Sequence, residues 1–291
     1  MLRFSTAKRL NNQPAPPHFP YAGETVAMIK TIRFILAMTL AFILLACASS
    51  PYVQTQNRKE AESYRNLGDA YFRQGDYTQA LRAYLQAQER FEPDATLHYS
   101  LGRVYIEKES YELAIQNLKR AIELNPDMAP AQDQLAVAYI KLGQLDLAEA
   151  TLKQMLESPS FAIYLNPQYP KYLLGWVYYL KKQYDRAEPY FLEVDKYYGD
   201  GITKKPLYVQ NLRALGLLKT ATGKPYEAIN YFKQVQAHAP EWPELYLDMA
   251  RAYRLADTPL QARQAYLKVI ELAPNSNLAQ TAAKEAATLK Q

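Results

Sequence analysis

Apolar residues recur at helical spacing along most of the chain, and the pattern is clearest over residues 95–128. Two helix-length segments lie there on either side of a polar turn at 108–110. Each segment places small and apolar side chains on one face, three and four residues apart. The residues of this face are Leu101, Gly102, Tyr105, Ala114, Leu118 and Ala121. The pattern predicts a helical hairpin, which cannot bury its apolar face without copies of itself alongside.

Five further copies of this hairpin pattern appear when the chain is aligned on the small residue of the first helix, which gives six units in all. The six units span residues 61–94, 95–128, 129–162, 168–201, 209–242 and 243–276. Two insertions, 163–167 and 202–208, interrupt the array. Residues 277–291 are predicted to form a C-terminal capping helix, because the last unit of a stack needs a polar outer surface.

The repeated pattern resembles the tetratricopeptide repeat in all six units. This resemblance implies an all-α fold, in which six helical hairpins and a C-terminal capping helix form a right-handed superhelix (an α-solenoid). Two residues depart from the pattern: Lys219 stands where other units carry an aromatic residue, and Met155 replaces a small alanine. We expect looser packing at both positions.

The N-terminal region has the pattern of a bacterial signal peptide over residues 28–46. Lys30 and Arg33 precede an apolar run at 34–46, which is too short for a comfortable transmembrane helix. The residues ending at Cys47 resemble a lipobox, which implies cleavage before Cys47 and attachment of lipid, including palmitate, to its thiol. An ordinary signal peptide, or a short anchor with an incidental cysteine, is the alternative. We expect translation to start at Met28, which makes residues 1–27 a doubtful extension.

The residues after the lipobox indicate where the folded part is displayed. Ala48 follows Cys47 and, by resemblance to bacterial sorting signals, favours the outer membrane of a Gram-negative bacterium, facing the periplasm. Residues 47–60 are polar and show no helical periodicity, which predicts a flexible tether. The repeats should therefore lie close to the membrane surface.

Charge and composition argue against nucleic acid and against catalysis. The formal charge of the chain is +5, but residues 1–46 contain most of the excess, and the remainder carries 29 basic and 28 acidic residues. A single cysteine excludes an intramolecular disulfide and a cysteine metal cluster. His18, His98 and His238 are not spaced as metal ligands, and no glycine-rich phosphate loop is present. We expect no enzyme activity, cofactor, metal or small-molecule substrate.

The resemblance implies a concave groove lined by the first helix of each unit, at positions 2, 5, 9, 12 and 13 counted from the start of the unit. The predicted protein-binding residues are Val137, Ile140, Tyr169, Tyr172, Trp176, Tyr179, Leu180, Arg213, Leu217 and Arg251. Further groove arginines are Arg65, Arg73, Arg103 and Arg254. Tyrosine, tryptophan and arginine are common anchors of protein interfaces. The alternative is that the two insertions cover this stripe or that Trp176 belongs to the core.

A lipobox, a short tether and six tetratricopeptide units are similar to the type IV pilus biogenesis and stability lipoproteins, the pilotins of the outer-membrane secretin. Residues 166–170 (NPQYP) and 240–243 (PEWP) resemble segments of that family, although the family places them closer together. This resemblance implies a membrane-anchored adaptor that binds a partner protein, such as a secretin subunit, and assists assembly or stability of its complex. The alternative is a periplasmic scaffold that recruits peptidoglycan hydrolases or outer-membrane assembly factors.

Overall fold

The computed structural model describes residues 28, 30–39, 51–158, 161, 166–199 and 206–289, and within these ranges the chain forms helices and turns without strands. The chain divides into two compact units between Lys59 and Glu60. In the first, residues 30–39 are helical. No helix in the described ranges is long and apolar enough to cross a membrane. Cys47 and residues 1–27 lie outside the described residues.

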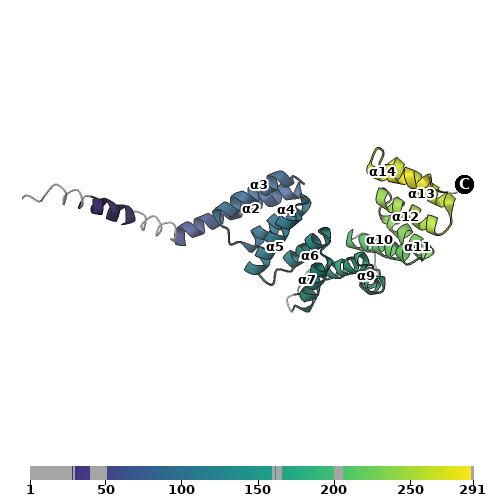
Figure 1. Cartoon of the computed structure of the whole chain (residues 1–291), viewed down its shortest axis with the longest axis horizontal. Helices are drawn as coiled ribbons and strands as arrows, with labels where there is room; N and C mark the ends of the chain where they lie inside the picture. Colours follow the sequence, from purple (N-terminus) through teal and green to yellow (C-terminus); the bar gives the residue numbers. More distant parts are fainter. Residues whose placement is uncertain are drawn as a thin grey trace, which may run out of the picture. The chain divides into compact units, whose positions relative to one another are not determined.

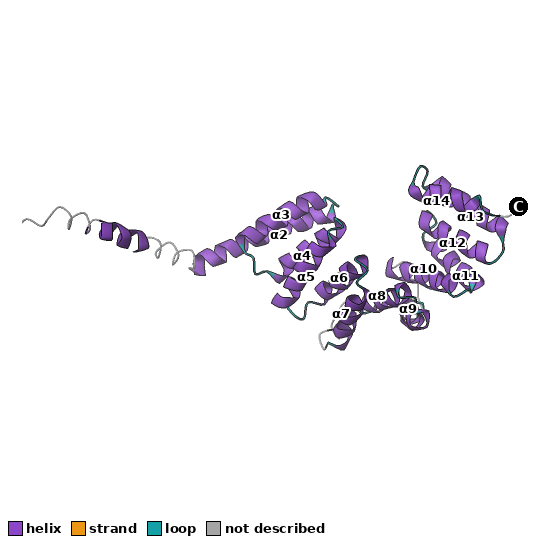
Figure 2. Ribbon diagram, in the orientation of Figure 1, coloured by secondary structure: helices purple, strands orange, loops and turns teal. Residues whose placement is uncertain are grey.

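The second compact unit is a stack of helical pairs that ends in one further helix (Figures 1 and 2). The first helices of successive repeats are α2 (Pro51–Arg73), α4 (Ala95–Glu107), α6 (Ala129–Lys141), α8 (Gln168–Leu180), α10 (Pro206–Ala221) and α12 (Pro243–Leu255). Their partners are α3 (Tyr77–Arg90), α5 (Tyr111–Leu124), α7 (Leu145–Glu157), α9 (Tyr184–Tyr198), α11 (Pro225–His238) and α13 (Pro259–Leu272). The terminal helix is α14 (Asn277–Ala286). The predicted fold class, an all-α solenoid of six hairpins and a capping helix, is confirmed.

Each hairpin closes through the same turn, with a residue of positive φ at position 15 of the unit. These residues are Gly75, Glu109, Gly143, Lys182, Gly223 and Asp257. In the second unit, the backbone N–H of Ser110 donates to the carbonyl of Tyr105 at 2.8 Å and that of Glu109 to Ile106 at 2.9 Å. This pair of hydrogen bonds is the Schellman ending of a helix, which satisfies carbonyls that would otherwise lack a partner.

Where the small residue of the first helix is glycine, a large side chain from the second helix of the same unit packs directly against it. A Cβ atom on Gly175 would lie 2.5 Å from the ring of Phe191, and one on Gly102 would lie 2.5 Å from Leu118. These distances are shorter than van der Waals contact, so the closeness of the two helices depends on the missing side chain. In the four units that carry glycine at this position, the cost of glycine within a helix is therefore offset by packing inside the unit.

Two helices begin earlier than the sequence indicates. α2 starts at Pro51, so residues 51–60 are helical rather than an irregular tether. The side chains of this extension are largely exposed, and an exposed helical stretch needs no apolar periodicity. α10 starts at Pro206, which places the end of the second insertion inside a helix. Proline favours such a position because its fixed φ suits the first turn.

The expected looser packing at Lys219 and Met155 is wrong. Met155 is 1% exposed and belongs to the core. Lys219 is 7% exposed, and its Nζ lies 2.7 Å from carboxylate oxygens of both Glu188 and Glu227. Burial alone would lower the pKa of Lys219, but hydrogen bonds to these two carboxylates raise it above its usual value. The buried ammonium of this lysine is thus held by two ion pairs, with Glu188 and Glu227 side chains that are 33% and 53% exposed.

Candidate partner-binding face

The first helices of successive repeats contact one another and present one continuous set of positions, here called the first-helix face. Its most aromatic part lies on α8 and comprises Tyr169, Tyr172, Trp176, Tyr179 and Leu180, the aromatic stripe. The ring centroids of Tyr169 and Tyr172 are 6.3 Å apart, those of Tyr172 and Trp176 are 6.2 Å apart, and those of Trp176 and Tyr179 are 5.2 Å apart. The rings hold one another in an ordered row, which lowers the entropy lost on binding.

The aromatic stripe is partly core and partly surface. Trp176 and Tyr172 each lie 6.1 Å from the ring of Phe191, the buried residue that also fills the space above Gly175. Tyr172 is only 8% exposed, whereas Leu180 is 44% exposed and Trp176 is intermediate. Residues 163–165 and 202–205 of the two insertions lie outside the described residues. The stripe has available surface at its Leu180 end and a structural role at Tyr172.

The apolar surface extends to both neighbouring first helices. Val137 and Ile140 of α6 are partly buried and pack against the same core as Trp176. Leu217 of α10 is partly buried against the core of the later units. The structure thus places the predicted apolar groove residues on three successive first helices.

Arg213 and Arg251, which are predicted to bind a partner, each form an ion pair within the chain. The Nε of Arg213 lies 2.7 Å from Asp248 on α12, and its guanidinium stands 4.9 Å from the ring centroid of Trp242. Arg251 makes hydrogen bonds of 2.6 to 3.2 Å to both carboxylate oxygens of Glu285 on α14. These pairs join successive units, so their charges are largely neutralised before any partner arrives.

The other groove arginines include residues with similar internal contacts. Arg65 donates to Asp94 at 2.8 Å. The guanidinium of Arg103 lies 4.1 Å from the ring centroid of Phe72 and 5.5 Å from that of Tyr99, which is a cation–π arrangement. These contacts also bind neighbouring first helices together.

The aromatic stripe itself is electrically neutral. Burial raises the pKa of Tyr169 and of Tyr172 above the usual value for tyrosine, and it raises that of Tyr179 as well. All three phenols therefore stay protonated at physiological pH. Along α8 the surface offers rings and hydroxyl groups, which suit an uncharged segment of a partner.

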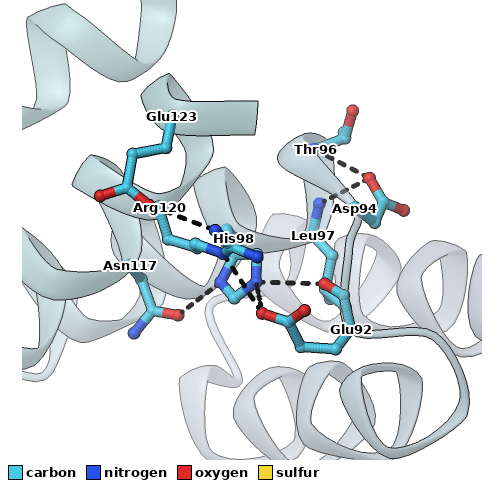
Figure 3. A network of polar contacts seen from close by, with 8 residues as sticks. All are labelled: Glu92, Asp94, Thr96, Leu97, His98, Asn117, Arg120 and Glu123. Atoms are coloured by element: carbon cyan, nitrogen blue, oxygen red, sulfur yellow. Dashed lines mark hydrogen bonds and ion pairs between the residues drawn. The ribbon is translucent and has the colours of Figure 1, made fainter. Parts of the chain in front are cut away.

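Sequence reasoning missed a buried polar cluster around His98 (Figure 3). His98 is 3% exposed; its Nδ1 is 3.1 Å from Asn117 Oδ1 and its Nε2 is 3.1 Å from the carbonyl of Glu92. The Glu92 carboxylate also accepts from Arg120 at 3.3 Å, a hydrogen bond that lowers the pKa of Glu92. The cluster fastens the α3–α4 connection to α5. Across the described residues, no group of three or more His, Cys, Asp or Glu side chains could hold a metal ion.

Comparison with known families identifies the repeats. Family models described as tetratricopeptide repeat match residues 65–129 and 134–200, residues 105–159, and residues 244–276. These matches fall on helical pairs that share the turn and packing described above. The chain is a tetratricopeptide-repeat protein. Such repeats are scaffolds for binding proteins and peptides.

The tetratricopeptide protein has two informative curated relatives. The DnaJ homolog subfamily C member 7 homolog of Schizosaccharomyces pombe is 25% identical over 201 residues, which covers 65% of this chain and 41% of the relative. The type IV pilus assembly protein PilF of Pseudomonas aeruginosa is 27% identical over 176 residues, which covers 60% of this chain and 64% of the relative. This chain thus spans less than two thirds of the length of either relative.

The fold is also that of a solved pilus protein. The crystal structure of PilW, described as a widely conserved type IV pilus biogenesis factor, superposes with a TM-score of 0.67 at 18% identity. The match covers 77% of this chain and 98% of PilW. At this identity the match shows the fold alone.

Proposed function

We propose that this protein is a membrane-anchored adaptor that binds a partner protein through the first-helix face. In this proposal the partner is a subunit of the type IV pilus secretin, and the adaptor assists assembly or stability of that outer-membrane complex. The observation that carries the proposal is the PilF alignment, which extends over 60% of the chain. The neutral aromatic stripe on α8 supports it by offering ordered, partly exposed rings to a partner.

The anchor in this proposal is a lipid on Cys47, which follows the apolar run at 34–46. The lipid would hold the repeats at the periplasmic face of the outer membrane. Lipid anchoring usually needs more than one chain for stable attachment, and a lipobox cysteine supplies several acyl chains on one residue. Replacing Cys47 by serine should therefore release the protein from the membrane fraction and abolish its labelling by radioactive palmitate.

The proposed function is tested by deleting the gene and measuring secretin multimers in outer membranes on denaturing gels. We expect loss of most multimer, recovery with the wild-type gene, and no full recovery with Cys47→Ser. Unchanged multimers would contradict the secretin proposal. Unchanged multimers together with co-purification of peptidoglycan hydrolases would favour the alternative, a periplasmic scaffold for cell-wall enzymes.

A further inference from the structure

A cavity of about 500 Å³ opens at the start of the aromatic stripe, between α8, α9 and α10. Tyr169, Tyr197 and Tyr198 form its aromatic wall, and Leu207 and two prolines add apolar surface. The amides of Asn166 and Gln210 are its polar groups besides the tyrosine hydroxyls. Tyr197 is 59% exposed, so the wall is accessible from outside.

The ends of both insertions meet at this cavity. Asn166 and Pro167 close the first insertion, and Pro206 and Leu207 come from the second, although the two are far apart in sequence. Tyr169 and Gln210 occupy position 2 in successive units, which is a position of the first-helix face. The cavity therefore lies where the two breaks in the array adjoin the predicted binding surface.

The chemistry of the cavity lining is distinctive because none of the described residues that form it carries a formal charge. Two other cavities in the described part of the chain contain charged side chains: one has Lys153, Arg186 and Glu193, and the other has Lys268. An ionised ligand group placed among tyrosines, prolines and amides would lose hydration without gaining a counter-charge. An apolar ligand group would not pay this cost, because it has no strong hydration to lose.

The cavity also continues directly into the aromatic stripe. Tyr169 belongs to both, and its ring stacks on that of Tyr172 at 6.3 Å. Beyond the stripe, the nearest arginine of α10, Arg213, is already neutralised by Asp248 at 2.7 Å. A segment that enters the cavity and follows α8 therefore meets uncharged rings and amides, and the nearby carboxylate of Asp133 on α6 is buried at 1% exposure.

We propose that this cavity receives a large apolar side chain, aromatic or leucine-like, from an uncharged segment of the partner protein. The residues next to this anchor lie along Trp176 and Tyr179. The side-chain amides of Asn166 and Gln210 then form hydrogen bonds with the backbone of the segment, since each amide can both donate and accept. This inference rests on the proposed function and adds the chemistry of the bound segment.

Photo-cross-linking in cells tests the cavity and the stripe separately. The full chain carries p-benzoylphenylalanine at Tyr197 in the cavity wall, at Leu180 in the stripe, or at Tyr226 on α11, which is 71% exposed and belongs to neither. We expect adducts with one partner at the first two positions and none at Tyr226. Mass spectrometry of the adduct should find a segment without charged residues around an aromatic or large aliphatic side chain.

The alternative outcomes separate the two proposals. Adducts at Leu180 but not at Tyr197 would leave the adaptor function standing and overturn the cavity inference. Adducts at neither position would count against both. A cross-linked segment with acidic or basic residues at the cavity would overturn the inference even if the partner is a secretin subunit.

Affinity measurements on the cross-linked segment, made as a synthetic peptide, give a second test. We expect Tyr197→Ala or Gln210→Lys to weaken binding at least about tenfold, as the loss of an interface anchor does. The matched controls Tyr226→Ala and Gln280→Lys, at exposed sites on α11 and α14, should change binding less than about twofold, within experimental scatter. Raising the salt from about 0.1 to about 0.5 M should have an equally small effect, because no ion pair is screened. Strong weakening by salt, or equal loss in the controls, would overturn the inference.

Discussion

The fourth repeat and the last two repeats use the same helix positions in opposite ways. At positions 5 and 9 the fourth repeat carries Tyr172 and Trp176, whose rings form a neutral row over Phe191. The fifth repeat carries Arg213 at position 5, which pairs with Asp248 on α12, and the sixth carries Arg251 at position 9, which pairs with Glu285 on α14. One region leaves part of this surface without a charged partner inside the chain, and the other uses the corresponding positions for ion pairs to later parts of the stack.

This difference shows that the type of residue at a groove position does not by itself determine whether its side chain is available to contact a partner. The acids that neutralise the two arginines, Asp248 and Glu285, lie about one repeat further along the chain. They come near only because first helices stack side by side. The aromatic residues have their supporting ring, Phe191, in their own unit, so their availability depends on one hairpin.

The largest loss of stability is expected when the ring that supports the aromatic stripe is removed. Phe191→Ala should cost about 3–5 kcal/mol, because the side chain is fully buried, and Phe232→Ala should cost a similar amount. Only Phe191 touches Trp176, so only its loss should change the environment of that tryptophan. Thermal unfolding measures the first effect. Fluorescence in a Trp242→Phe background, where Trp176 is the sole tryptophan, measures the second; equal red shifts in both variants would contradict the comparison.

A smaller effect should follow from breaking the ion pair of the later region. Arg213→Ala leaves Asp248, whose side chain is 7% exposed, without its hydrogen-bonded cation and should cost about 3 kcal/mol at neutral pH. Burial already raises the pKa of Asp248 despite Arg213. A raised folded pKa favours the protonated native state, so the loss should shrink as the pH falls and Asp248 takes up a proton. Denaturant unfolding at about pH 7 and about pH 4.5 checks this.

Arg251→Ala provides the matched control, because its loss of stability should also shrink as the pH falls, but over a lower pH range than for Arg213→Ala. Hydrogen bonds from Arg251 are the main cause that lowers the pKa of Glu285. The stability that this pair contributes in the wild type is therefore present at neutral pH and lost as the pH falls below the usual range of glutamate. Because Arg251 is 41% exposed, the loss at neutral pH should be smaller than for Arg213→Ala. A larger loss of stability in Arg251→Ala than in Arg213→Ala would show that burial does not determine how much each ion pair contributes.

The smallest effect on stability is expected at the two exposed leucines at position 13. Leu180 and Leu255 are 44% and 49% exposed, so Leu180→Asp and Leu255→Asp should each change stability by about 0.5 kcal/mol or less. Only Leu180 lies in the aromatic stripe, and only its replacement should weaken partner binding. Co-purification of the partner with each variant measures this difference. Equal binding by both variants would remove α8 as the docking surface.

The repeat period allowed the fold to be predicted, because one spacing rule applies to every unit. Details that break a local rule could not be predicted in this way. Glu109 adopts a positive φ that is rare for its residue type, since the Schellman ending of its helix requires it. The exposed turns of α2 before residue 61 carry no apolar pattern to read.

The residue types of the candidate site were predictable from the sequence, but the burial of each side chain was not. Helical spacing placed Tyr172 and Leu180 on one face of α8, yet their exposed fractions are 8% and 44%. The difference arises from Phe191 beneath Tyr172 and from the end of the helix at Leu180, both of which are three-dimensional facts. The cavity at Tyr197 depends on two insertions that meet only in the folded chain.

The buried partners at position 11 limit how these repeats could be rearranged. Tyr178 donates to Glu149 of the preceding unit at 2.8 Å, and Lys219 contacts Glu188 at the same place one unit later. Glu149 and Glu188 stand at position 21 of their units, where the first, second and fifth units carry Leu81, Ile115 and Ile229. A chimera that moved the fifth repeat behind one of those would leave its lysine ammonium against a hydrocarbon side chain. The contact with Glu188 therefore favours the fourth repeat as the neighbour of the fifth, even though the repeats share one fold.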